Sequence, residues 1–72
     1  MSHEKYEGIT EALEYAEDTG QSVNVGLNRG GEGVKIEGII KKVGENFFRI
    51  LLEETGQIDT VAISEVEYVE YS

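Results

Sequence analysis

The sequence predicts one mainly β domain, in which an N-terminal α-helix precedes a five-stranded, strongly bent antiparallel small barrel. Apolar residues recur at intervals of three and four in residues 2–18, which is helical spacing. From residue 21 onward, short runs that alternate apolar and polar residues are separated by turn residues, which is typical of strands. Gly38 lies inside the longest run, where a sharp bend or a close backbone approach is expected. The single domain, residues 1–72, thus consists of a helical part (1–20) and a barrel (21–72).

The predicted helix spans residues 2–18 and carries a narrow apolar stripe. The stripe consists of Tyr6, Ile9, Leu13 and Ala16. Ser2 is a candidate N-cap, and Glu4 and Glu7 suit the positive end of the helix dipole. Gly20 is expected to end the helix in the left-handed conformation. The small stripe favours a helix that covers one open end of the sheet, and a partner-binding helix is the alternative.

The first two predicted strands form a hairpin. Residues 22–28 alternate, with Val23, Val25 and Leu27 on one face, and residues 34–43 form the second strand. The connection, residues 29–33, holds three glycines and could cradle a phosphate through backbone N–H groups. A hairpin loop is the favoured interpretation, because no Lys-Ser/Thr pair follows and a strand stands where a phosphate loop needs a helix.

Three further strands are predicted at residues 46–54, 58–63 and 66–71. Turns at residues 44–46 and 53–57 precede the first two, and Gly56 is expected to supply a positive φ. The run at residues 46–54 is apolar on both faces, so part of its second face should be covered by the helix or by another subunit. The predicted core consists of Leu13, Val25, Leu27, Ile36, Ile40, Ile50, Leu52 and Ile63.

Charge and composition restrict the function. The chain has 15 acidic and 6 basic residues and a net charge of -9. Such a charge repels polyanions at long range and argues against non-specific nucleic-acid binding, while leaving room for a local basic patch, a basic protein partner or a high-salt habitat. There is no Cys, and the single His is His3, so we expect no metal site and no cofactor.

The cellular location is expected to be the cytoplasm. The absence of Cys is compatible with that compartment. No run approaches the length of about 18 apolar residues that a spanning helix needs, so no membrane association is expected. The N-terminus lacks the basic and then apolar order of a signal peptide.

The order of elements resembles the Sm-like fold, the SH3-like small barrel of Sm proteins, Lsm proteins and the bacterial host factor Hfq. The resemblance covers residues 21–71. It rests on the alternating first strand, on the mid-strand Gly38, on Ile50-Leu51-Leu52 and on Val61-Ala62-Ile63-Ser64, which is similar to an Ala-Ile-Ser step in Hfq. It implies a barrel and a ring assembly in which the fourth strand pairs with the fifth strand of a neighbour.

The RNA-binding positions of that family are not matched. The Sm pattern has an Asp near the turn before strand three and an Asn within that strand, whereas Gly44-Glu45-Asn46 and then Phe48 and Arg49 stand here. Thr60 and Val61 occupy the places of a Lys-His pair that reads uridine in Hfq. If RNA is bound, the candidate residues are Arg29, Lys41, Lys42, Asn46, Phe47 and Arg49.

The favoured function is a small acidic module for protein interaction or structure that forms a homo-oligomer, and a divergent RNA-binding protein is the alternative. No catalytic residues are assigned, because the carboxylates mostly alternate with apolar residues as on solvated faces. The C-terminal strand is an unblocked edge that pairs readily with another chain. The expected oligomer interface consists of Val61, Ile63, Val66, Tyr68, Val69 and Tyr71.

Overall fold

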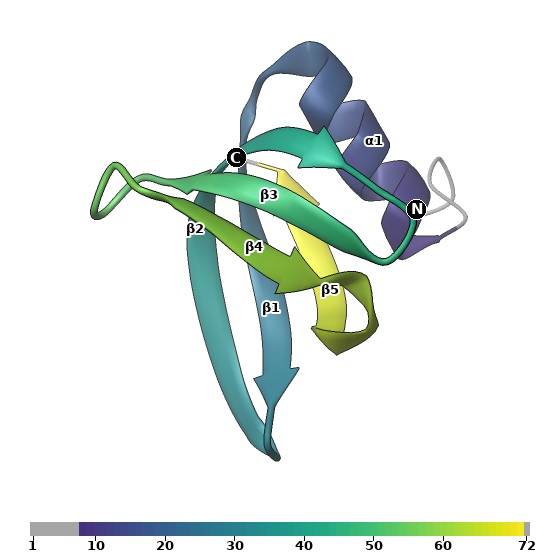
Figure 1. Cartoon of the computed structure of the whole chain (residues 1–72), viewed down its shortest axis with the longest axis vertical. Coiled ribbons are helices and arrows are strands. Elements are labelled where there is room, and N and C mark those ends of the chain that lie inside the picture. The colour runs from purple at the N-terminus through teal and green to yellow at the C-terminus, as the bar shows by residue number, and fades with distance from the viewer. Residues whose placement is uncertain (1–7, 72) are drawn as a thin grey trace.

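The computed structural model describes residues 8–71, which form an N-terminal helix and a five-stranded antiparallel sheet (Figure 1). The elements are α1 (Ile9–Thr19), β1 (Ser22–Arg29), β2 (Glu32–Val43), β3 (Phe47–Leu52), β4 (Ile58–Ala62) and β5 (Val66–Tyr71). A single turn of 3₁₀ helix, Ile63–Glu65, joins β4 to β5. The predicted mainly β class, with its helix before five strands, is confirmed.

Helix α1 begins later than predicted. Gly8 is extended at φ -159°, and its carbonyl accepts the first helical hydrogen bond from the N–H of Ala12 at 3.1 Å. The prediction of one continuous helix over residues 2–18 was therefore wrong at Gly8, where glycine readily leaves the helical conformation. The C-terminal prediction is confirmed, since Gly20 is left-handed and its N–H bonds to the carbonyl of Ala16 at 2.9 Å. The residues expected to cap and extend the helix lie outside the described residues: Ser2, Glu4, Tyr6 and Glu7.

Strands β1 and β2 form one long hairpin with a two-residue turn. Their register runs from the pair Ser22–Ile39 to the pair Arg29–Glu32. Gly30 and Gly31 form the turn with φ of 60° and 87°, and positive φ at both positions is what the tight hairpin turn requires. The predicted hairpin loop is confirmed, and the alternative phosphate loop is wrong because strand follows strand directly.

Gly38 is the point at which β2 gains a second neighbour. It pairs with Val23 of β1 and with Leu52 of β3. A Cβ atom on Gly38 would lie far inside van der Waals contact of the Leu51 carbonyl oxygen, so the two backbones approach too closely for any side chain. The expected close approach is confirmed. On the N-terminal side of Gly38, β2 continues along β1 without β3 on its other edge.

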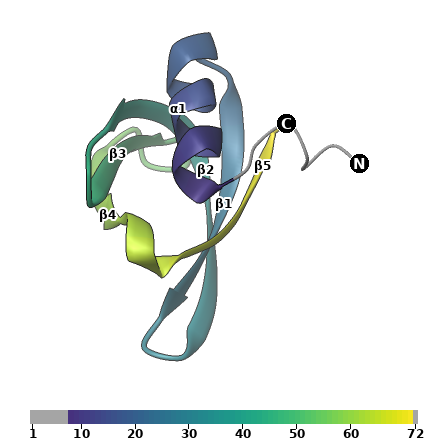
Figure 2. The same cartoon turned by 90° about the vertical axis from the view of Figure 1, so that its right-hand side faces the viewer.

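The sheet is curled but open, so the predicted closed barrel was wrong. Its strand order is β4-β3-β2-β1-β5, which places β4 and β5 at opposite edges with no pairing between them. The physical reason is the connection, because the 3₁₀ helix carries the chain across the open side of the sheet instead of reversing it into a hairpin (Figure 2). Each of these two strands keeps one unpaired edge within the described chain.

The core lies between α1 and the concave face of the sheet. Five members of the predicted core are fully buried: Leu13, Val25, Leu27, Ile40 and Ile50. The other three pack against the core but remain half-buried: Ile36, Leu52 and Ile63. Ala12, Ala16, Val23, Phe48 and Val61 complete the buried hydrophobic residues of the described chain. The half-buried members lie where the open sheet leaves the core uncovered.

Candidate functional site

Most of the predicted RNA-binding cations gather at one end of the β2–β3 hairpin. The register shifts there, so that Ile40 pairs with Ile50 and Lys42 with Arg49, and Lys41 is the extra residue of a β-bulge. Lys41, Lys42 and Arg49 are exposed. These three residues form the bulge cluster, a local basic patch on an acidic chain.

Phe47 extends the bulge cluster with an exposed aromatic ring. It lies two residues before Arg49 on β3 and therefore on the same face of the sheet. Its side chain is 55% exposed, which is unusual for a phenylalanine in a small domain. Asn46 precedes it, and its backbone carbonyl accepts a hydrogen bond from the N–H of Ile63 at 2.9 Å. Five of the six predicted RNA candidates are thus brought together.

Arg29, the sixth predicted RNA-binding residue, lies away from the bulge cluster. It ends β1 at the tip of the first hairpin and makes two ion pairs, from Nη2 to Asp59 Oδ2 at 3.8 Å and from Nε to Glu65 Oε1 at 3.3 Å. Asp59 belongs to β4 and Glu65 to the 3₁₀ helix, so this guanidinium joins the hairpin to the edge strand β4 and to the connection that follows it. Arg29 is therefore a structural link, and its charge is already balanced.

The predicted oligomer interface falls on the two edge strands and their connection. Val61 is only 1% exposed, so its side chain belongs to the core of a single chain, and β4 can offer only its backbone there. Ile63, Val66 and Val69 are half-buried against the core, whereas Tyr68 is exposed. Tyr71 donates its hydroxyl hydrogen to the carbonyl of Ala12 at 2.7 Å, which ties β5 to α1.

Ile58 adds an exposed apolar side chain to β4 that sequence reasoning did not single out. It opens the strand and is 57% exposed. Its period-two alternation with Thr60 and Ala62 could have identified it as an outward-facing position. A large exposed apolar residue beside an unpaired strand edge is a feature of surfaces that contact another chain.

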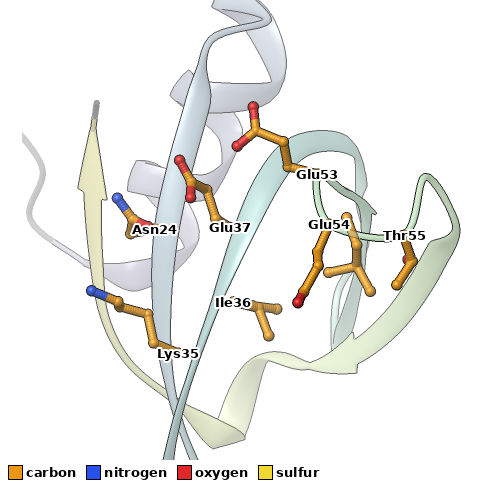
Figure 3. A pocket seen from close by; sticks show the side chains of 8 residues that line it. Asn24, Lys35, Ile36, Glu37, Glu53, Glu54 and Thr55 are labelled. Atoms are coloured by element: carbon orange, nitrogen blue, oxygen red, sulfur yellow. The ribbon is translucent and has the colours of Figure 1, made fainter.

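An open groove of about 400 Å³ lies where β3 parts from β2 (Figure 3). It was not predicted, because its two sides are distant in the sequence. The lining residues come from β1, β2, the end of β3 and the β3–β4 turn: Asn24, Lys35, Ile36, Glu37, Leu52, Glu53, Glu54 and Thr55. Ile36 and Leu52 are half-buried, and the three glutamates are exposed. The groove thus combines an apolar base with acidic sides.

Among residues 8–71, no group of three or more His, Cys, Asp or Glu side chains is placed to hold a metal ion. No helix in that range is both long and apolar enough to cross a membrane.

Comparison with known proteins gave no family. A scan against models of protein families and a search of curated proteins each returned no match for this chain. The Sm-like resemblance therefore stays a prediction, and the candidate sites depend on the geometry described above.

Proposed function

We propose that the chain is a self-assembling cytoplasmic module for protein interaction or structure, in which β4 of one copy pairs with β5 of the next. The observation that carries this proposal is the open sheet, whose two edge strands lie at opposite ends of the order β4-β3-β2-β1-β5. A contact between two different edges is head-to-tail and forms a ring when the rotation closes. This arrangement is the one that the Sm-like resemblance implies.

The backbone of β4 is oriented for such pairing. The N–H of Ile63 bonds to the carbonyl of Asn46, and the N–H of Leu52 to the carbonyl of Gln57, at 2.9 Å and 2.8 Å. These bonds fix the alternation of the antiparallel ladder, so that the N–H and C=O of Thr60 point away from β3. A neighbouring strand would meet these free groups next to the exposed side chain of Ile58.

Thr60→Pro tests the assembly, because proline removes an N–H from the free edge and none from the ladder to β3. Light scattering of the natural chain at high micromolar concentration should give a mass of several subunits. The Thr60→Pro chain should scatter as one 8.0 kDa chain with an unchanged circular dichroism spectrum. Thr60→Val, which keeps the N–H, is the matched control and should still assemble. A single 8.0 kDa species for the natural chain would overturn the proposal.

RNA binding is the second candidate function, and the bulge cluster beside Phe47 is the observation that favours it. Lys and Arg neutralise phosphates, and an exposed aromatic ring can stack on a base. The places of the uridine-reading pair are held by Thr60 and Val61, and Val61 is buried. We therefore expect oligo-uridine binding to be weak and steeply dependent on salt.

Fluorescence polarisation of labelled oligo-uridine, titrated at several salt concentrations, measures this second function. Lys41→Glu/Lys42→Glu should remove the binding that remains at low salt. Lys35→Glu, which changes a cation outside the bulge cluster, should have a smaller effect. Tight binding that persists at physiological salt would make RNA binding the main function in place of assembly.

A further inference from the structure

The groove beside Gly38 exposes a stretch of strand backbone. The N–H of Glu53 bonds to the carbonyl of Glu37 at 2.9 Å, which is the last hydrogen bond between the two sides before they separate. Because backbone groups alternate along an antiparallel strand, the N–H and C=O of Lys35 also point away from β1 and toward the groove. An extended peptide can form ladder hydrogen bonds with groups oriented in this way.

The side chains around this backbone are apolar on one face of the sheet and acidic on the other. Ile36 and Leu52 lie on the concave face of the sheet and give the groove its half-buried apolar base. Glu37 and Glu53 are opposite each other on the other face, and Glu54 follows in the turn (Figure 3). Three carboxylates surround the groove against one ammonium, that of Lys35.

We propose that this groove binds an extended segment of a partner protein that alternates apolar and basic residues. Successive side chains of an added strand point to opposite faces. One set would pack on Ile36 and Leu52, and the other would meet Glu37 and Glu53. The peptide backbone would bond to Lys35, so this strand extends the free half of β2.

A second copy of this chain does not suit the groove. Its free edge strand β5 carries Glu67 and Glu70 and would bring more negative charge to three carboxylates. Its other edge strand, β4, carries Asp59 and no Lys or Arg. The groove is therefore distinct from the edge pairing proposed above, and its three carboxylates favour a basic partner.

Fluorescence anisotropy with a labelled peptide of alternating Lys and Val, added to the full chain, tests the proposal. Saturable binding is expected. A block peptide of the same composition, with all Val before all Lys, should bind more weakly, because it cannot place its two residue types on opposite faces. A peptide of alternating Glu and Val should not bind. Failure of the alternating Lys-Val peptide to bind, or equal binding by the block peptide, would overturn the proposal.

Variants of the groove then locate the site. Glu53→Lys/Glu54→Lys should weaken binding about tenfold, since two attractive charge contacts become repulsive. Glu14→Lys/Glu45→Lys makes the same change in net charge at exposed positions on α1 and in the β2–β3 loop, and should change binding less than about twofold. An equal loss of peptide affinity in the two double variants would show that binding depends only on the total charge, and the assignment of the site to the groove would be wrong.

Two substitutions of Lys35 distinguish the contribution of backbone hydrogen bonds to peptide binding from that of side-chain contacts. Lys35→Pro should abolish peptide binding, because it removes an N–H from the groove and none from the β1 ladder, so the fold tolerates it. Lys35→Ala should bind the Lys-Val peptide more tightly, because it removes the one cation of the groove. If Thr60→Pro removed peptide binding and Lys35→Pro did not, the peptide would occupy the β4 edge and the groove assignment would be wrong.

Discussion

Gly38 lets the backbones of β2 and β3 approach closely, and its replacement tests how much the fold depends on that contact. Gly38→Ala should reduce the free energy of unfolding by roughly 1–3 kcal/mol, because the new methyl group meets the Leu51 carbonyl, which belongs to the backbone and cannot rotate away. Urea denaturation followed by circular dichroism measures the loss. All variants should be compared at one protein concentration, since assembly would add to apparent stability.

Gly33→Ala is the matched control on the same strand. A Cβ atom at Gly33 would meet nothing within 4 Å, and the residue does not have a positive φ. The free energy of unfolding should therefore stay the same or rise by roughly 0.4–1 kcal/mol through the stiffer unfolded chain. Equal losses in the two variants would mean that β2 tolerates no side chain for some reason other than the contact with Leu51.

Individual residues were predictable from the sequence where alternation alone decides which face a side chain takes. Val25, Leu27, Ile40 and Ile50 were expected in the core and are buried. Val61 follows the same alternation, yet it was assigned to an interface by position in the Sm-like pattern, and it is buried in a single chain. The partial exposure of Ile36 was not predictable, because it depends on β3 leaving β2 at Gly38.

Among the elements, α1 and β5 are far apart in the sequence but are joined by a hydrogen bond and an aromatic contact. The hydroxyl of Tyr71 donates to the carbonyl of Ala12 at 2.7 Å, and the Tyr71 ring meets the Tyr15 ring edge-on with centroids 5.7 Å apart. Tyr71→Phe keeps the ring and removes the hydrogen bond, so thermal or urea unfolding should show a loss of about 1 kcal/mol. Tyr68→Phe, on the exposed outer side of β5, should change stability by less than about 0.5 kcal/mol. Equal losses would mean that the hydroxyl of Tyr71 does not hold the helix.

The order and type of the elements could be predicted from the sequence, but the open state of the sheet, with β4 and β5 unpaired, could not. The boundaries of β1 and β5 were predicted to within one residue, because alternating runs end at turn residues. Whether β4 meets β5 depends on the path of residues 63–65, and no local pattern encodes the direction of so short a connection. The groove has the same origin, since Ile36 and Leu52 become neighbours only through the register of β2 with β3.

At the scale of the whole molecule, the net charge makes self-assembly and RNA binding depend differently on salt. The described chain measures 30 × 27 × 23 Å, which is about one Debye length at 0.01 M salt, so at low salt the charges of two copies joined by their edges repel one another across both molecules. Each copy carries a net charge of -9. Edge pairing must therefore overcome repulsion between copies, and added salt screens that repulsion.

Assembly and RNA binding should consequently respond to salt in opposite directions. Raising the salt concentration should increase the average mass of the natural chain in sedimentation velocity, because screening favours contact between like-charged copies. Oligo-uridine binding should weaken over the same range, because counterions compete for phosphates. The Thr60→Pro chain should keep its 8.0 kDa mass at every salt concentration, which shows whether the response comes from the β4 edge. An assembly that dissociates as salt rises would contradict edge pairing against net repulsion, and would indicate copies held by ion pairs such as those between the bulge cluster and a neighbouring acidic surface.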